Sequence, residues 1–401
     1  MARIGIFTDT WLPNINGVTF SVLNQIKVLE ADHELFLFVP RTAADKLEKI
    51  PDSVEIIEFP GLEFPSYPGY KITYGVVSRK LRRAAKEQRL DLLHAQTPFF
   101  LGWASMLVRR IQKIPMVATF HTHLAEYAGH IFKGICEEQV KRALWGATWD
   151  LIRNQYNHYD ITFTPSKSMR WELIEHGVNR VIDMPNPLSP VFLETTSIPA
   201  EQKQHFRKRF GIPQEAQLLV YVGRIAFEKR LGVLLKAFKG LEQRHKDVYL
   251  AIVGDGPQMG MYKKMARELG LKNYVFTSYV SHQKLPTVYQ TAQVFISPSD
   301  TETQGLTFLE AMSQGCPVIA VRSRGVADYI KHEQNGFFAN KLDPAEFEGL
   351  IERALTNPEE MRMIRTNARK TAELYDYDHF RQRLLRGYRM AIAYWDEQGR
   401  K

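Results

Sequence analysis

The chain has 401 residues, more than one hydrophobic core usually supports, and its 44% hydrophobic and 24% charged residues are typical of a globular protein. Its net charge of +9 (53 Lys and Arg against 44 Asp and Glu) favours a polyanionic partner, such as a nucleotide, an acidic membrane face or a nucleic acid. No apolar run reaches the ~18 to 20 residues that span a bilayer, and the two cysteines give no disulfide framework, so we expect a cytosolic chain without a signal peptide.

The first predicted strand, residues 3–7 (RIGIF), leads through the loop WLPNINGV to a helix. Asn16 and Gly17 stand just before the helical sequence VTFSVLNQIKVL. A helix start has unpaired backbone N–H groups and a partial positive charge, so it favours the binding of an anion. This turn is the first of three strand-to-helix turns, of which the two in the second half of the chain are suited to phosphate.

The loop at residues 61–71, GLEFPSYPGYK, carries three aromatic residues among prolines, Phe64, Tyr67 and Tyr70. Exposed aromatic rings beside a basic helix could enter a lipid interface. The alternative is a loop packed on its own domain.

A basic segment follows directly, at residues 78–89. Leu81, Ala84 and Ala85 lie at helical spacing and predict one apolar stripe on this helix. A basic amphipathic helix is typical of contact with a membrane surface, and a solvated helix face is the alternative. No zinc finger or basic–aromatic alternation supports nucleic acid binding. The basic residues of the segment are Arg79, Lys80, Arg82, Arg83, Lys86 and Arg89.

His121 and His123 end the predicted strand at residues 115–120, within VATFHTHL. A lone histidine in such a place is more often a structural hydrogen-bonding residue than a catalytic one. The residues alone leave both roles open.

Strand-like and helical runs alternate along the whole chain, which predicts parallel sheets covered on both faces. The strand-like runs are RIGIF, ELFLFV, VEIIEF, DLLHA, PMVATF, ITFTPS and RVIDM in the first half, and LLVYVG, VYLAIVG, YVFTSYV, VFISPS and PVIAVRS in the second. The four prolines at residues 184–202 predict a break, so we expect two Rossmann-like domains, at 1–190 and 191–375. Ligands of such sheets bind beyond the carboxyl ends of the strands, which predicts an active site in a cleft between the domains.

The second turn of interest, GRIAFEKR, joins the strand at 218–223 to the helix LGVLLKAF. Arg224 can grip two phosphate oxygens at once, and Lys229 can act as a point charge. Two solvated basic residues on a surface loop are the alternative.

The third turn lies in DTETQGLTFLEAMSQG, residues 300–315. Glu302 is predicted in the loop and Glu310 about two turns into the helix, so the two carboxylates could flank a bound anion. Gly305 would let the backbone approach that anion closely. The alternative is a charge that favours the helix start plus one solvated glutamate. Together, the three turns indicate a nucleoside diphosphate ligand.

GRxxxxK followed by Glu-x(7)-Glu resembles the retaining glycosyltransferases of family 4, which have the two-domain GT-B fold. The resemblance extends over nearly the whole chain, through TDTWLPNINGV, TFHTH, TPSKS, VGDGP and TETQGLTFLEAMSQGCPVIA. Within the family, the first and last of these motifs are most similar to bacterial diacylglycerol glucosyltransferases. The family usually has Pro-Asn-Gly at the end of the first domain, where this chain has Pro185-Asn186-Pro187, so the hinge conformation stays open.

The resemblance implies roles for individual residues. His121 would face the donor sugar, Glu302 would contact the sugar hydroxyls, and Glu310 would accept hydrogen bonds from the ribose. Arg224 and Lys229 would neutralise the leaving diphosphate in place of a metal ion, without a cofactor. Whether a carboxylate acts as nucleophile, or the leaving phosphate takes the proton of the acceptor, stays open. The full set implied to bind the donor is Gly17, Arg224, Lys229, Gly254, Val280, Gly305, Leu306, Thr307 and Glu310.

The function that the resemblance implies is transfer of a hexose, glucose first, from a UDP-sugar to a membrane lipid such as 1,2-diacylglycerol. The alternative is a GDP-mannose-dependent enzyme acting on a phosphatidylinositol-type lipid, or another family 4 enzyme. The first domain would bind the acceptor and the membrane, and the helix at 376–401 would return to it. We expect a protein peripherally attached to the inner face of the cell membrane, with an anionic membrane surface as partner.

Overall fold

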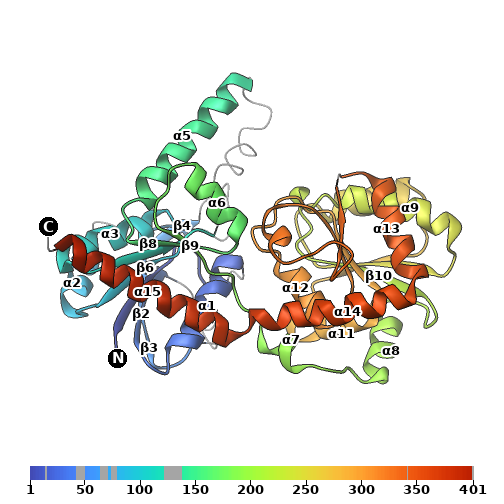
Figure 1. Ribbon diagram of the computed structural model, residues 1–401, viewed down its shortest axis with the longest axis horizontal. Helices are drawn as coiled ribbons and strands as arrows, with labels where there is room; N and C mark the ends of the chain where they lie inside the picture. Colours follow the sequence, from blue (N-terminus) through green and yellow to red (C-terminus); the bar gives the residue numbers. More distant parts are fainter. Residues whose placement is uncertain are drawn as a thin grey trace. The chain divides into compact units, whose positions relative to one another are not determined.

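A computed structural model of the chain describes residues 1–13, 16–41, 50–63, 71–73, 79–121, 138–340 and 342–399, with side chains throughout except at 63 and 138–141. The chain forms two compact units (Figure 1). The first comprises Met1–Asn186 with Tyr377–Lys401, and the second comprises Pro187–Asp376. The chain leaves the first unit within the proline-rich stretch 184–202 and re-enters it at the last helix.

The first unit is built on a seven-stranded parallel sheet with the strand order β3-β2-β1-β6-β7-β8-β9. Its strands are β1 (Arg3–Phe7), β2 (Glu34–Pro40), β3 (Val54–Phe59), β6 (Leu92–Ala95), β7 (Met116–Thr119), β8 (Ile161–Thr164) and β9 (Val181–Asp183). Its helices are α1 (Gly17–Leu29), α2 (Arg79–Glu87), α3 (Phe100–Gln112), α5 (Glu138–Tyr156), α6 (Lys167–Glu175) and α15 (Tyr377–Gly399).

Both faces of this sheet are buried, because successive side chains of each strand point to opposite faces. In β2, Leu35, Leu37 and Val39 pack on the face that α1 and α15 cover. Phe36 and Phe38 pack on the other face, under α2, α3, α5 and α6. The predicted return of the last helix to the first unit is therefore confirmed.

The second unit is built on a six-stranded parallel sheet with the strand order β12-β11-β10-β13-β14-β15. Its strands are β10 (Gln217–Val222), β11 (Val248–Val253), β12 (Tyr274–Ser278), β13 (Val294–Ser297), β14 (Val318–Val321) and β15 (Phe337–Ala339). Its α-helices are α7 (Pro190–Glu194), α8 (Ala200–Arg209), α9 (Leu231–Arg244), α10 (Met259–Glu268), α11 (Leu285–Thr291), α12 (Leu306–Ser313), α13 (Pro344–Thr356) and α14 (Pro358–Ala372). Its 3₁₀ turns are η2 (Phe227–Lys229), η3 (His282–Lys284), η4 (Arg324–Asp328) and η5 (Glu373–Tyr375).

The second sheet is also covered on both faces. Leu218, Val220 and Val222 of β10 face a core shared with α7, α8, α11, α12 and α14. Leu219 and Tyr221 face a core shared with α9, α10 and α13. The prediction of an α/β protein with two Rossmann-like sheets is confirmed.

Two sequence expectations need correction. The segment 61–71 was expected to be a loop throughout, but β4 (Gly61–Glu63) pairs antiparallel with β5 (Lys71–Thr73). The strand β15 was not predicted, because its apolar run is limited to FFA between Gly336 and Asn340. Phe64, Tyr67, Tyr70, His123 and Cys136 lie outside the described residues.

Each sheet has one point at which the order of connection reverses. In the first sheet it lies between β1 and β6, and in the second between β10 and β13. Open parallel sheets bind ligands at such points, beyond the carboxyl ends of the strands. The two predicted phosphate loops of the second unit follow β10 and β13 and therefore meet at its switch point.

Candidate functional site

The loops after β10 and β11 are joined backbone to backbone at the carboxyl edge of the second sheet. The Gly223 N–H donates to the Val253 carbonyl at 3.0 Å, and the Ile225 N–H donates to the Asp255 carbonyl at 2.8 Å. The fit requires glycine at 254, because a Cβ there would lie 1.9 Å from the carbonyl oxygen of Gly223 and the backbone φ is +138°. The segment that carries Arg224 is thus held against the next loop without side chains between them.

Lys229 and Glu302 form an ion pair across the switch point. Lys229 ends η2 after β10, Glu302 lies in the loop after β13, and Nζ lies 2.6 Å from Oε1. Both side chains are largely buried, with 20% and 15% of their surface exposed, which contradicts the alternative of solvated charges. Burial alone would raise the pKa of Glu302, but the nearby Lys229 ammonium and the Arg224 charge outweigh it and hold this pKa below its ordinary value.

Arg224 differs from Lys229 in its surroundings. Its guanidinium is 56% exposed and pairs with Glu228 four residues on. Arg230, also in this loop, pairs with Asp300 at 3.4 Å. The loop after β10 therefore presents three cations beside the switch point, and the exposed one is Arg224.

The start of α12 forms the third part of this edge. Gly305 precedes the helix with φ +76°, and the Tyr329 hydroxyl lies 2.9 Å from the carbonyl oxygens of Gln304 and Gly305. Leu306 and Thr307 are the first two residues of the helix, so their backbone N–H groups belong to its first turn, where an anion is favoured.

Glu310 is the fifth residue of α12, so it lies about one turn into the helix rather than the two turns that we expected. It is buried, and its carboxylate is held from α11 and η3: the Tyr289 hydroxyl donates to Oε2 at 3.0 Å, and His282 Nε2 lies 3.2 Å from Oε1. Val280, two residues after β12, is half-buried and packs against the core of the second unit to which α11 and α12 contribute. Glu310 is thus a fixed carboxylate rather than a solvated one.

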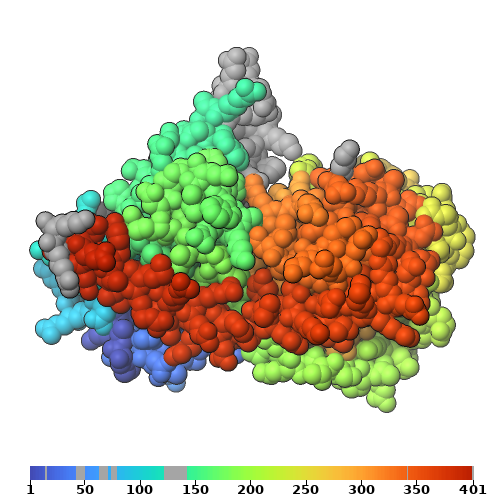
Figure 2. Space-filling model, in the orientation of Figure 1, coloured from blue at the N-terminus to red at the C-terminus, as the bar shows by residue number. Residues whose placement is uncertain are grey.

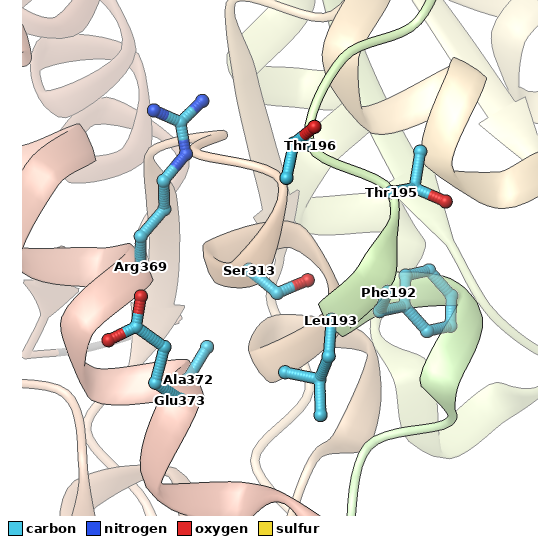
Figure 3. Close-up of a pocket in the computed structure, with 8 residues that line it drawn as sticks. All are labelled: Phe192, Leu193, Thr195, Thr196, Ser313, Arg369, Ala372 and Glu373. Atoms are coloured by element: carbon cyan, nitrogen blue, oxygen red, sulfur yellow. The ribbon is translucent and has the colours of Figure 1, made fainter.

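A hollow of about 260 Å³ lies elsewhere in the second unit (Figure 3). Its lining includes Leu193 of α7, Ser313 at the end of α12 and Glu373 after α14. Because Ser313 ends the helix that Leu306 begins, the hollow lies about 10 Å along α12 from the predicted phosphate-binding site. It is therefore separate from the candidate site.

In the first unit, Gly17 begins α1 and is exposed. Asn16 caps the helix, its side-chain oxygen accepting from the N–H groups of Val18 and Thr19 at 3.0 Å each. A Cβ at Gly17 would meet no atom within 4 Å, so packing does not require glycine at this position.

His121 lies two residues after β7 and is half-buried. Its Nε2 lies 2.8 Å from the amide oxygen of Gln96, which follows β6. Burial lowers the pKa of His121 to about 3, so the ring is neutral at physiological pH.

Asp9 lies at the switch point of the first sheet, two residues after β1, and is fully buried. Its carboxylate accepts from the Thr97 hydroxyl at 2.5 Å and from the Leu101 N–H, at the start of α3, at 2.9 Å. Burial raises the pKa of Asp9 to about 6, although these hydrogen bonds lower it.

Asp9→Asn should change how stability depends on pH. Between about pH 4 and 6 the folded chain keeps the Asp9 proton and the unfolded chain releases it, so the free energy of unfolding falls as pH rises through this window. The raised pKa corresponds to about 3 kcal/mol of lost stability above pH 6, which the Asn variant should recover. Urea unfolding of both proteins across this range measures the effect.

The control for this experiment is Asp91→Asn, which removes an exposed carboxylate of the same unit. It should leave the pH dependence of the parent unchanged. Parallel curves for the parent and Asp9→Asn would contradict the assignment of a raised pKa to Asp9.

The basic helix α2 is shorter than the predicted 78–89, and its apolar stripe of Leu81, Ala84 and Ala85 is buried as predicted. It lies at the surface of the first unit, with its residues in light blue (Figure 2). Lys80 Nζ donates to the Glu58 carbonyl at 2.7 Å, and Arg83 pairs with Glu87. The exposed residues Arg79, Arg82, Arg83, Lys86 and Glu87 line a shallow hollow.

Sequence reasoning missed several residues at the carboxyl edges of the two large sheets. Asp9 and Gln96 each follow a buried strand at the carboxyl edge of the sheet, and this position is a signal that could have identified them. His282 and Tyr289 reach Glu310 from 28 and 21 residues away, and no spacing in the sequence indicates that contact.

Within the described ranges, no helix is long and apolar enough to cross a membrane. In the same ranges, no three His, Cys, Asp or Glu side chains gather into a group that could hold a metal ion.

Two family models match the chain. Residues 15–190 match the model described as Glycosyltransferase Family 4, and residues 202–371 match Glycosyl transferases group 1.

Among characterised relatives, the alpha-monoglucosyldiacylglycerol synthase of Acholeplasma laidlawii is 31% identical over 93% of both chains. The synthase of the same name from Streptococcus pneumoniae is 33% identical over 79% of this chain and 70% of its own. A GDP-mannose-dependent alpha-mannosyltransferase of Corynebacterium glutamicum is 28% identical over 85% of this chain and 77% of its own. The crystal structure of Anabaena HepE in complex with UDP-glucose has the same fold, with a TM-score of 0.76 and 15% identity over 96% of this chain and 99% of its own.

Proposed function

The chain belongs to glycosyltransferase family 4, and we propose that it transfers glucose from UDP-glucose to 1,2-diacylglycerol with retention at the anomeric carbon. The observation that carries this proposal is the 31–33% identity with two alpha-monoglucosyldiacylglycerol synthases. Their names describe an alpha-linked product. Because the glucose of UDP-glucose is also alpha-linked, formation of an alpha-linked product by this chain would be retention at the anomeric carbon.

The donor diphosphate would sit at the switch point of the second sheet. Arg224 and Lys229 would stabilise the charge that develops on it as the glycosidic bond breaks, supported by the first turn of α12 at Leu306 and Thr307. Without ligand, Lys229 is already neutralised by Glu302 at 2.6 Å. Diphosphate binding would therefore share this ammonium between the carboxylate and the phosphate.

Other residues would hold the rest of the donor. Gly254 and Val280 lie at the same sheet edge. Glu310, fixed by Tyr289 and His282, would accept hydrogen bonds from the ribose hydroxyls. Gly17 and His121 of the first unit would contact the diphosphate and the sugar, since a residue without a Cβ at the start of α1 admits a close ligand.

A second candidate is a GDP-mannose-dependent mannosyltransferase. It is favoured by the 28% identity with the Corynebacterium glutamicum enzyme over 85% of the chain. The two candidates share the site described above and differ in the base, the hexose and the acceptor.

A screen of nucleotide sugars against lipid acceptors tests the proposal. UDP-glucose, UDP-galactose and GDP-mannose are each offered with diacylglycerol or phosphatidylinositol in mixed vesicles, and products are identified by mass spectrometry. We expect a monoglucosyl lipid from UDP-glucose and diacylglycerol, alpha-linked by NMR. A product formed only from GDP-mannose would establish the second candidate instead.

Activity should not depend on a divalent metal. If Arg224 and Lys229 provide the positive charge at the diphosphate, turnover in excess EDTA should stay within about twofold of the untreated enzyme. Initial rates with EDTA, and with EDTA followed by manganese, measure this. A rate that is lost with EDTA and restored by manganese would contradict the proposed role of the two cations.

The acceptor stays in a bilayer, so the enzyme would dock at the cytoplasmic face of the cell membrane. Helix α2 supports this proposal with its exposed basic residues Arg79, Arg82 and Lys86. Phe99 and Trp103, at the start of the neighbouring α3, expose 37% and 52% of their surface and would add apolar contacts.

Replacing Arg79, Arg82 and Lys86 by Gln should weaken binding to anionic vesicles. Each basic residue near an anionic surface contributes about 1 kcal/mol, so three should account for roughly 100-fold in affinity. Sedimentation with vesicles of increasing phosphatidylglycerol content measures this, with UDP binding as a check on the second unit.

A matched control for this variant removes Arg383, Arg386 and Arg389 instead, which are exposed on α15, on the opposite face of the same sheet. The charge change is identical. Equal vesicle binding by the two triple variants would show that α2 is a solvated surface.

A further inference from the structure

Two buried glutamines connect α1 to His121 in the first unit. Gln96 donates from Nε2 to Gln25 Oε1 at 2.7 Å, and Gln25 Nε2 lies 3.2 Å from Gln96 Oε1, so the two amides face each other as a pair. Both side chains are at most 1% exposed. Gln96 Oε1 also lies 2.8 Å from His121 Nε2. Because the two amides are bonded to each other, Gln96 alone cannot turn its oxygen away from His121 without setting two oxygens or two NH₂ groups opposite each other.

The contact between Gln96 and His121 assigns the hydrogen on the histidine ring. An amide oxygen only accepts, so the ring nitrogen facing it must be a donor. A neutral imidazole carries one N–H, so a hydrogen on Nε2 makes Nδ1 an acceptor. Burial disfavours the doubly protonated ring, which would offer two donors.

We propose that Gln96 and Gln25 are positioning residues that fix His121 as the Nε2–H tautomer, so that Nδ1 accepts a hydrogen bond from a hydroxyl group of the donor hexose. That the hydroxyl belongs to a hexose donor rests on the proposed function, whereas the assignment of the tautomer does not. The consequence for the reaction is that His121 orients the sugar as an acceptor and neither gives nor takes a proton.

The tautomer can be measured without substrate by NMR. In protein labelled with ¹⁵N in the histidine rings, two-bond and three-bond ¹H–¹⁵N correlations distinguish a protonated from an unprotonated ring nitrogen. The signals of His121 are those lost in His121→Asn. We expect Nδ1 to be unprotonated in the parent, and a hydrogen on Nδ1 would overturn the proposal.

Two substitutions at Gln96 separate positioning from packing. Gln96→Leu removes the acceptor and should give a mixture of both tautomers, whereas Gln96→Glu keeps an oxygen facing Nε2 and should retain the parent tautomer at mildly alkaline pH. Gln25→Leu should also give a mixture. The control is Gln112→Leu, a glutamine that links α3 to the backbone of α2 in the same unit and should leave the His121 signals unchanged.

Kinetics then test the acceptor role. Gln96→Leu should reduce kcat about 10-fold with little change in the KM for the lipid, and Gln96→Glu should restore most of the loss. Unchanged kcat in Gln96→Leu together with mixed tautomers would overturn the role of Nδ1. If another donor or acceptor proves correct, the same kinetics apply to that substrate, and the NMR result is unaffected.

Discussion

Lys229→Met is expected to reduce turnover by at least about 100-fold while leaving the chain folded. The substitution keeps the length of the side chain and removes the ammonium that would stabilise the leaving diphosphate, and loss of one such group in a preorganised site typically costs 10² to 10³ in rate. It also leaves Glu302 buried without its partner 2.6 Å away, which should lower the free energy of unfolding by about 3 kcal/mol. Initial rates and thermal unfolding of the second unit measure the two effects separately.

The double variant Lys229→Met with Glu302→Gln distinguishes electrostatic catalysis from folding. Removing the orphaned carboxylate should recover most of the lost stability, yet turnover should stay low. Lys264→Met is the control, because Lys264 is an exposed lysine of the same unit that pairs with Glu268. Turnover near the parental rate in Lys229→Met would remove Lys229 from the site.

Gly254→Ala should abolish UDP binding and destabilise the second unit. The new Cβ would stand 1.9 Å from the Gly223 carbonyl oxygen, and φ +138° is strained for any L side chain. Since the obstacle is backbone, the loop after β10 must move, and Arg224 moves with it. We expect an unfolding free energy at least about 3 kcal/mol below that of the parent, measured by urea denaturation, with UDP titrated by calorimetry.

Gly260→Ala is the matched control for this substitution. Gly260 lies in α10 of the same unit, and a Cβ there would meet nothing within 4 Å. It should raise stability slightly, because alanine favours a helix by about 1 kcal/mol over glycine. Parental UDP affinity in Gly254→Ala would show that the two loops do not form the donor site.

The sequence predicts most of the fold, because strands buried on both faces are continuous apolar runs. The strands of both large sheets stand at the predicted runs except β15, whose apolar run is limited to FFA between Gly336 and Asn340. The pairing of β4 with β5 depends on backbone hydrogen bonds between short segments, and no side-chain pattern indicates this pairing. Local signals therefore identified the other strands of the two large sheets and missed β15, β4 and β5.

For the candidate site, the sequence predicts where individual residues lie but not how they pair. The position of Arg224, Lys229 and Glu302 follows from their place after apolar strands, since parallel strands end at one edge. The ion pair between Lys229 and Glu302 joins residues 73 apart in the chain, and its geometry depends on the switch in strand order. Such pairing follows from topology, which the sequence of either loop does not contain.

The return of α15 to the first sheet bears on the order in which the protein can be made. On the ribosome, Met1–Asn186 emerge early but lack the helix whose Tyr388 hydroxyl meets buried His94 at 2.9 Å. The nascent first unit therefore has only α1 over this face of its sheet until α15 has been made. The second unit is continuous, and the Leu188 N–H already meets the Tyr375 carbonyl at 2.7 Å near its two ends. It can therefore fold first, which makes α15 the last element of the first unit to pack and a poor place for a truncation.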